Sequence, residues 1–390
     1  MRLHGKRERW HELFAGFLLA AMVLILCSCS PRAEDVAMPA AAQTDTRRQD
    51  TAQRCEAIAA LIHGAADQAE AEQLLTGAGY CVITSDGGAP AYVANSAAFY
   101  DFIARAGQGT DVQQELLRVT DTGDLSYMCF SCEDGQLYYS SMRYCVSAGE
   151  ESFAESFETH AVLDYTLTER GSFYFQLYPA GDKHYADYSR LRLEKPDAEL
   201  YALTQRYVLP VGYKAVNLFL RDWQEPDFGA ISFNDLLDAL YFLQSGTRLD
   251  PEQWEQNGYL YRIPAEEFEA AVMSFFQIEQ ACLRALARYD AQTGSYPYKP
   301  FVTNDAVWYN FPLVEPEVTA CRENSDGTLT LTVDVASADL KTDRLFSHEL
   351  RVRETEDGGF EYVANRIVYQ TELGLPPDEA RLDMAAETYG

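Results

Sequence analysis

The cysteines are the first residues of the chain whose type and spacing could do chemistry. Cys129 and Cys132 have the CxxC spacing of redox enzymes, in which the first cysteine normally opens a helix that lowers its pKa. Residues 125–139 instead predict a strand, a turn at residues 133–135 and a second strand. A zinc site would need a second pair or a histidine at ligand spacing, and His160 is too loosely spaced. We therefore expect no redox site, no metal site and no cofactor.

The histidines and the known catalytic motifs also point to no particular reaction. The chain contains no GxSxG, SxxK or HExxH motif, no phosphate-binding glycine loop and no dinucleotide fingerprint. His63, His160 and His184 are widely separated along the chain. His348 alternates in phase with apolar Leu350, which predicts a partly buried structural histidine.

Acidic side chains could act in pairs, either as the carboxylates of a glycosidase or as ligands of Ca²⁺. The candidates are the group Asp222, Glu225 and Asp227 and the pair Asp235 and Asp238. Such pairs also arise by chance in a chain with 60 acidic residues. The sequence therefore leaves catalysis open, favours a protein that is not an enzyme and assigns no catalytic residue.

An aromatic, proline-rich stretch is a candidate binding patch. Exposed rings could stack on sugar faces or accept a peptide. The other interpretation, which we favour, is that these rings fold back over the junction between helices and sheet. The six rings are Tyr296, Tyr298, Phe301, Trp308, Tyr309 and Phe311.

The N-terminus carries an export signal. A basic segment with Arg2, Lys6, Arg7 and Arg9 precedes an apolar run over residues 13–26, which is short for a membrane span. The segment Leu26-Cys27-Ser28-Cys29 resembles the bacterial lipobox, which implies cleavage before Cys29 and acylation of that residue, for example with palmitate. Cys27 fits less well, because Leu26 before it is not small. A plain signal peptide or an uncleaved anchor is the alternative.

The charge of the chain excludes one class of partner. Its 31 basic and 60 acidic side chains give a formal charge of −29, whereas nucleic-acid binding depends on clustered Lys and Arg. Loss of residues 1–28 would remove four basic and two acidic side chains and leave −31. Anionic membrane surfaces repel such a protein, so a lipid would have to hold it at the cell membrane, on the extracytoplasmic face. Solubility outside the cell explains the acidity best.

The periodicity of apolar residues predicts an α+β protein with two domains, each made of helices plus an antiparallel sheet. Residues 29–52 lack an apolar period and are rich in Ala, Thr, Asp and Arg, so we expect a flexible linker. The second domain resembles cystatin-like or NTF2-like folds in the order of its elements, an analogy that carries no function. The expected parts are a signal peptide at 1–28, the linker at 29–52, an N-terminal domain at 53–222, a C-terminal domain at 223–375 and a tail at 376–390.

The C-terminal part also carries a family resemblance. Four stretches are similar to an uncharacterised family of lipoproteins from clostridia-type Gram-positive bacteria: 261–269 (YRIPAEEFE), 324–331 (NSDGTLTL), 346–353 (FSHELRVR) and 362–365 (YVAN). The similarity is good over about the last 170 residues and loose elsewhere. Because the family is a domain of unknown function, the resemblance implies a location and no activity.

Taken together, these observations favour a lipid-anchored, extracytoplasmic protein that binds another envelope protein or a glycan. The alternative is an envelope hydrolase that acts on wall glycan or peptide through an acid pair that the sequence does not identify.

Overall fold

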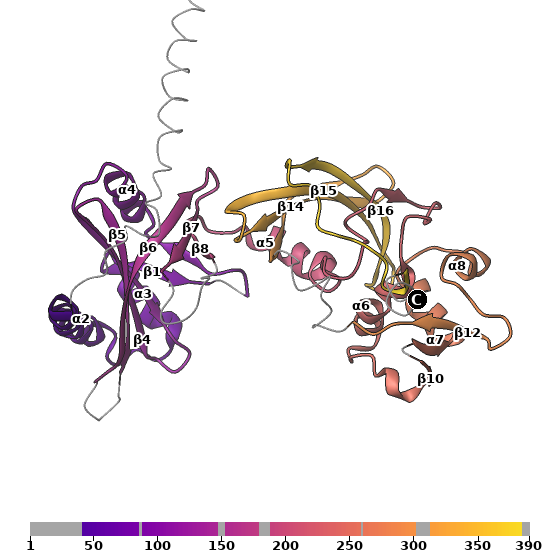
Figure 1. The fold of residues 1–390 in the computed structure, drawn as a ribbon, viewed down its shortest axis with the longest axis horizontal. Helices are drawn as coiled ribbons and strands as arrows, with labels where there is room; N and C mark the ends of the chain where they lie inside the picture. Colours follow the sequence, from indigo (N-terminus) through magenta and orange to yellow (C-terminus); the bar gives the residue numbers. More distant parts are fainter. Residues whose placement is uncertain are drawn as a thin grey trace, which may run out of the picture. The chain divides into compact units, whose positions relative to one another are not determined.

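A computed structural model describes residues 41–85, 88–146, 153–178, 188–258, 260–301 and 313–383 (Figure 1). The contacts between Cα atoms divide the chain into two compact units, residues 1–85 with 91–195, and residues 86–90 with 196–390. Both units combine helices with mainly antiparallel strands, which confirms the α+β class. The signal segment, with Cys27 and Cys29, lies outside the described residues.

The strands of the first unit form one sheet in the order β2-β1-β3-β4-β5-β6-β7-β8. Strands β1 and β3 run parallel, and the other neighbouring pairs are antiparallel. The strands are β1 (Cys81–Thr84), β2 (Tyr92–Ala94), β3 (Val112–Val119), β4 (Leu125–Glu133), β5 (Gln136–Cys145), β6 (Phe153–Leu167), β7 (Ser172–Leu177) and β8 (Tyr188–Arg192). Strands β3 to β8 follow one another as an antiparallel meander, in line with the antiparallel sheet expected for this part of the chain.

Helices cover both faces of this sheet, and alternation along the strands gives each face its own core. On one face, α2 (Ala41–Ile62) and α3 (Gln68–Gly77) bury Ile58 and Leu75 against the odd-numbered positions of β4, such as Leu125. On the other face, α4 (Ala97–Ala106) buries Phe99 against the even-numbered positions, such as Phe130. The sheet is therefore a rigid layer that supports helices on two sides.

The flexible linker expected over residues 29–52 is wrong for its last part, because α2 already begins at Ala41. The apolar pattern over residues 41–50 is too weak to predict a helix. The segment is nevertheless rich in alanine and other good helix formers, and Arg47 pairs with Glu133 on the sheet. Tertiary contacts thus make this stretch helical, although its local periodicity does not predict a helix.

The second unit has two sheets. The larger has the order β13-β14-β15-β16-β9, and the smaller has the order β10-β11-β12. Their strands are β9 (Trp223–Gln224), β10 (Glu255–Asn257), β11 (Leu260–Pro264), β12 (Ser295–Tyr298), β13 (Val314–Glu323), β14 (Thr328–Ser337), β15 (Thr342–Glu354) and β16 (Phe360–Gln370). The helices are α5 (Ala198–Leu203), the π-helical turn η2 (Thr204–Val208), α6 (Phe233–Ser245), the 3-10 turn η3 (Pro251–Gln253), α7 (Ala265–Met273) and α8 (Gln280–Leu286).

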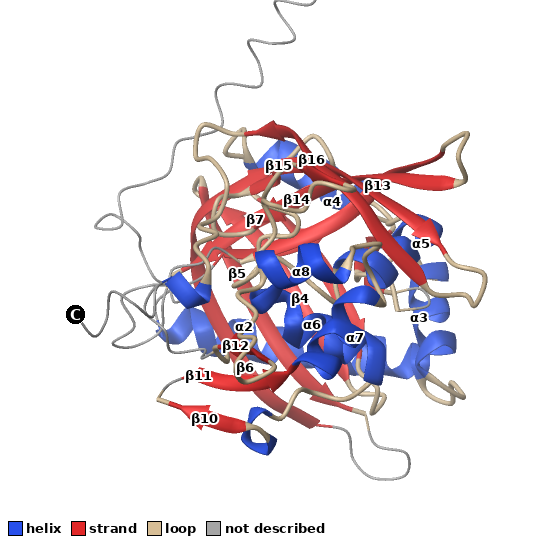
Figure 2. Ribbon diagram, turned by 90° about the vertical axis from the view of Figure 1, so that its right-hand side faces the viewer, coloured by secondary structure: helices blue, strands red, loops and turns tan. Residues whose placement is uncertain are grey.

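One face of the larger sheet carries the core of this unit. Leu331, Val333 and Val335 of β14 alternate into it, as their spacing predicts, and belong to one buried cluster with Leu236 of α6 and Phe268 of α7. Figure 2 shows the strands and helices of this unit as ribbons. The segments Ser325-Asp326-Gly327 and Glu356-Asp357-Gly358 lie between the antiparallel strands β13 and β14 and between β15 and β16. Helix packing on one face thus leaves the other face of the sheet polar.

Residues 196–222 belong to this same core. The sequence assigns them to the N-terminal domain, whereas Tyr207, Val208 and Leu218 are buried among the residues of the second unit. The contact boundary accordingly lies between residues 195 and 196.

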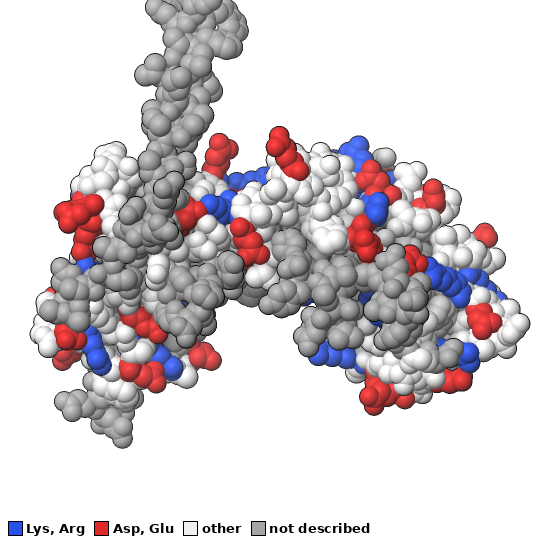
Figure 3. All heavy atoms as spheres, in the orientation of Figure 1, with Lys and Arg blue, Asp and Glu red and all other residues white. Residues whose placement is uncertain are grey.

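Among the described residues, no helix is both long enough and apolar enough to cross a membrane. On the face seen in Figure 3, basic side chains stand beside acidic ones at several places.

His348 on β15 is fully buried in the core of the second unit. Its Nδ1 lies 2.6 Å from the Asn365 side-chain oxygen, and its Nε2 lies 2.7 Å from the Tyr213 hydroxyl. The Asn365 amide group donates to the Arg221 carbonyl, so its oxygen must accept, which makes His348 Nδ1 the donor and Nε2 the acceptor from Tyr213. The geometry therefore suits a neutral histidine.

Burial lowers the pKa of His348 from 6.5 to about 4. Between these values the unfolded chain binds a proton that the folded chain does not, so this histidine makes stability fall as the pH falls from 6.5 to 4, by at most about 3 kcal/mol. We expect His348→Gln to show a shallower pH dependence of the urea midpoint, followed by the fluorescence of buried Trp223. His63→Gln, at an exposed site, should keep the wild-type slope. Parallel curves for wild type and His348→Gln would contradict this assignment.

Candidate functional site

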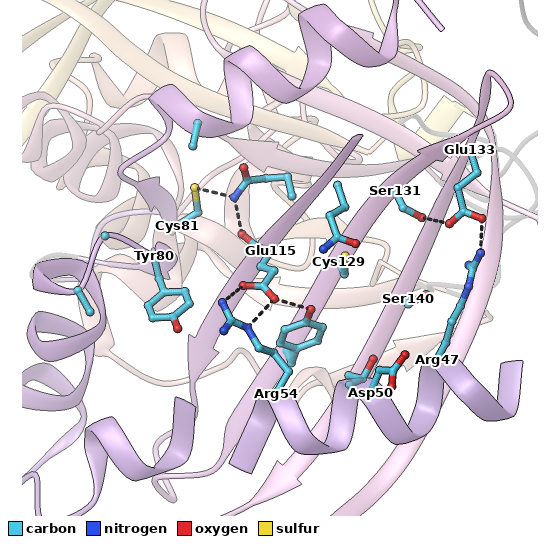
Figure 4. A pocket seen from close by; sticks show the side chains of 17 residues that line it. Arg47, Asp50, Arg54, Tyr80, Cys81, Glu115, Cys129, Ser131, Glu133 and Ser140 are labelled. Atoms are coloured by element: carbon cyan, nitrogen blue, oxygen red, sulfur yellow. Dashed lines mark hydrogen bonds and ion pairs between the residues drawn. The ribbon is translucent and has the colours of Figure 1, made fainter. Parts of the chain in front are cut away.

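The N-terminal half of α2 covers a groove of about 800 Å³ on the sheet of the first unit (Figure 4). Its floor is formed by β3, β4 and β5, and residues of β1 and of the turn before it lie at one end. A volume of this size is typical of sites that hold a small organic ligand. Polar side chains line most of it, which sets it apart from the apolar contacts under the other half of the same helix.

The strands create the groove by changing character along one face. Positions under the C-terminal half of α2 are apolar: Leu117 and Val119 on β3, Leu125 and Tyr127 on β4, and Met142 and Tyr144 on β5. Further along the same face the strands present Gln113 and Glu115, then Cys129, Ser131 and Glu133, and finally Ser140. Because side chains of one face recur every second residue, the helix packs closely over the first set and leaves space over the second.

Two arginines of α2 reach across the groove to glutamates on the sheet, one helical heptad apart. Arg54 Nε and Nη2 each donate to a carboxylate oxygen of Glu115 at 2.9 Å, and Arg47 Nη2 donates to Glu133. Figure 4 shows both side chains extending from the helix toward the strands. The forked Arg54–Glu115 contact fixes orientation as well as distance. The two pairs together hold the polar part of α2 over the sheet, where apolar packing is absent.

Hydroxyl groups extend these pairs. The Tyr127 hydroxyl donates to Glu115 at 3.0 Å, and the Ser131 hydroxyl donates to Glu133 at 3.1 Å. Burial, together with Cys129 and Glu115, raises the pKa of Tyr127 well above its ordinary value. Burial also raises the pKa of the Cys129 thiol to about 11, so that the thiol is protonated at neutral pH and a poor nucleophile. The groove therefore offers fixed donors and acceptors, and its Cys129 thiol is not activated.

The cysteine pair of the CxxC motif does not come together. Cys129 packs toward α2 and Cys132 packs toward α4, on opposite faces of β4. The strand–turn–strand prediction for this motif is confirmed by β4 and β5. The seven cysteines in the described part of the chain are free thiols, and no cluster of metal-ligating side chains occurs among the described residues.

The aromatic patch needs a correction at two of its rings. Tyr296 and Tyr298 lie on β12 and are fully buried, with their hydroxyls bonded to Glu269 and Asp238. Phe301 is half-buried, beside the Lys214 ammonium group. The remaining rings, Trp308, Tyr309 and Phe311, lie outside the described residues.

The first acidic group serves the fold. Asp222 accepts a hydrogen bond from the Ile367 amide at 2.7 Å, and Asp227 accepts one from the Gly229 amide at 3.1 Å. Glu225 pairs with Arg353 at 3.3 Å. Each of the three carboxylates thus has a partner in the structure.

Asp235 and Asp238 of α6 are joined by Arg381. Arg381 Nε lies 3.1 Å from Asp235 Oδ1, and Nη1 lies 2.9 Å from Asp238 Oδ2. Ser232 precedes α6, but its side chain makes no cap bond, and the Asp235 carboxylate faces Arg381. Burial raises the pKa of Asp235, although Arg381 acts in the opposite direction. Arg381, from the predicted tail 376–390, is itself buried, so this part of the tail is integral to the second unit.

Of the groove residues, the sequence draws attention to Cys129 alone, through its CxxC spacing. The sequence does contain a signal for the change from groove floor to apolar core. Between residues 112 and 133, the odd-numbered positions change from polar to apolar and back to polar, whereas the even-numbered positions do not show this change. Locating the groove from this signal requires the pairing of β3 with β4 and the position of α2, which no local pattern gives.

We expect Arg54→Gln to loosen the part of α2 that lies over the groove, because Glu115 would lose its forked partner. Because the pair is partly exposed, its loss should lower the free energy of local opening of the helix by about 1 kcal/mol. The amides of α2 that precede Cys55 should then exchange their hydrogens roughly fivefold faster. Arg48→Gln, at an exposed position of the same helix, is the matched control. Equal exchange rates in the two variants would show that the pair does not hold the helix.

Arg381→Met should destabilise the second unit by about 3–5 kcal/mol in urea unfolding, because it leaves the Asp235 carboxylate buried without a counter-charge. Adding Asp235→Asn should recover part of the loss. Arg288→Met removes an exposed pair with Asp383 in the same C-terminal segment and should cost less than about 1 kcal/mol. Similar losses for the two arginine variants would refute the special role of Arg381.

Comparison with known proteins places the chain in a family without assigning it an activity. No curated protein and no solved structure matches it, so the cystatin-like or NTF2-like resemblance stays a prediction. A family model described as a family of unknown function, DUF6070, matches residues 45–381. The match includes both compact units from α2 to Arg381. The chain therefore belongs to the DUF6070 family of unknown function.

Proposed function

We propose that this protein is a lipid-anchored, extracytoplasmic protein of the cell envelope that binds a ligand in the groove under α2 and is not an enzyme. The observation that carries the binding part is the groove itself, a polar cavity of about 800 Å³ whose arginines are already paired with glutamates. A carboxylate held by an arginine is a poor general base, and the two thiols of the lining, Cys81 and Cys129, have raised pKa values and are poor nucleophiles. Binding therefore suits the groove better than catalysis.

The proposed location rests on the N-terminal sequence. The basic segment, the apolar run and Leu26-Cys27-Ser28-Cys29 support export, cleavage and acylation of Cys29. A single acyl chain holds a protein to a membrane only weakly, whereas two or three hold it durably. The alternative of an envelope hydrolase has less support, because the acidic candidates at residues 222–238 each contact an arginine or a backbone amide.

The anchor is tested by Cys29→Ala with metabolic labelling by an alkyne-bearing palmitate analogue. We expect wild type to take up label and to sediment with membranes, and Cys29→Ala to take up none and to leave the membrane fraction. Cys27→Ala is the matched control, two positions away, and should stay labelled. Continued labelling of Cys29→Ala would refute the proposed anchor.

The binding role is tested by photo-crosslinking in the native envelope, with the probe placed at exposed Asp50 on the rim of the groove. A probe at exposed Gln73 on α3, outside the groove, is the control. Capture of envelope protein or glycan at residue 50 and not at residue 73 supports a binding groove. No capture at either position contradicts it.

A further inference from the structure

We infer that the groove under α2 takes a neutral, polyhydroxylated ligand, a segment of glycan without net charge. The inference rests on the proposed binding function and adds the chemical class of the ligand. It is carried by three properties of the lining: the pairing of its charges, the mixture of its hydrogen-bonding groups, and an aromatic ring at one end.

The charges of the groove give an ionic ligand little to bind. Arg47 and Arg54 are the basic lining residues, and each is paired with a glutamate. An anion would have to displace Glu115 or Glu133 from its arginine, and the overall charge of −29 would oppose its approach. A cation would meet carboxylates that already have arginine partners, apart from exposed Asp50 at the rim. Neither an anionic nor a cationic ligand would therefore gain a strong new ion pair in the groove.

The hydrogen-bonding groups of the groove suit hydroxyl groups. A sugar hydroxyl both donates and accepts, and the lining supplies both functions side by side. Donors remain on the guanidinium groups of Arg47 and Arg54, acceptor lone pairs remain on Glu115 and Glu133, and Gln113 offers an amide with both. The arginines and glutamates are held rigid by their own pairs. Planar groups fixed in this way can contact neighbouring hydroxyls in pairs, with little further loss of side-chain entropy on binding.

Tyr80 adds an apolar surface at one end of the groove. Its ring is half-buried, and the Arg54 guanidinium carbon lies 5.5 Å from its centre. Figure 4 places this ring next to the Arg54–Glu115 pair, so that the aromatic surface and the polar groups lie together. A sugar ring has apolar C–H faces and polar edges, and an aromatic ring beside fixed polar groups matches both. A lipid or an apolar peptide would remove water from the remaining donors and acceptors of these groups and offer no hydrogen bonds in return, which is costly.

The test uses the full chain, purified in detergent, and uncharged tetramers of N-acetylglucosamine and of glucose. The charged counterparts are the glucosamine tetramer as cation and the galacturonate tetramer as anion. We expect at least one uncharged tetramer to bind by calorimetry, with an affinity that changes little between low and high salt. The two charged tetramers should bind at least about tenfold more weakly.

Gln113→Ala should weaken the uncharged tetramer about tenfold without lowering the melting temperature, because Gln113 is exposed on the floor of the groove. Gln73→Ala removes an equally exposed amide outside the groove and should leave binding unchanged. Tighter binding of a charged tetramer, or equal binding by the two variants, would overturn the inference.

The inference and the proposed function can fail separately. Envelope capture at residue 50 with no binding of either uncharged tetramer overturns the neutral-glycan inference and leaves the binding function standing. If neither envelope capture nor tetramer binding is observed, the neutral-glycan inference and the proposed binding function are both wrong.

Discussion

The excess of carboxylates over cations is the constraint on which this structure depends. With 60 acidic and 31 basic side chains, arginines are scarce, and they contact the buried carboxylates of Asp235 and Glu269 and the half-buried carboxylate of Glu115. The sites where this happens are also the sites where separate elements meet. Arg54 joins α2 to β3 through Glu115, and Arg381 joins the C-terminal segment to α6 through Asp235. Because breaking the buried Arg381–Asp235 pair costs more than forming it gains, this contact specifies where an element lies rather than how stable the fold is.

The Glu269 carboxylate shows the same principle in a denser form. It accepts hydrogen bonds from Arg284 of α8 at 2.8 Å and from the Tyr296 hydroxyl of β12 at 2.9 Å, and Gln280 donates to it as well. These partners lower the pKa of Glu269 despite the opposing effect of burial. One carboxylate thus joins α7, α8 and the smaller sheet. The ring of Tyr296 therefore packs in the core, stacked on Phe268, although its neighbourhood in the sequence looks like an exposed loop.

The sequence predicts those parts of the fold that rest on local alternation. The β4–β5 hairpin and the run of β14 follow from period-two patterns and from glycine turns, and both are confirmed. Contacts between distant positions have no local signature: Glu115 is 61 residues from Arg54, and Asp235 is 146 residues from Arg381. The aromatic stretch is an intermediate case. Tyr296 and Tyr298 alternate around Pro297 as a strand does, but the prolines favour an irregular loop, and the pairing with β11 decides the outcome.

The groove depends both on local alternation along the strands and on long-range ion pairs. The negative charge of the chain also limits the ligands that the groove can bind. The alternation of β3, β4 and β5 makes the floor, whereas long-range arginine pairs hold α2 over it. Once the arginines have been used to hold the helix, they are no longer free to attract an anion. Under the proposed function, the negative charge that would push the protein away from an anionic membrane also keeps anionic polymers out of the groove. A neutral ligand is the one class whose approach this charge does not oppose and whose binding does not require a pair to break.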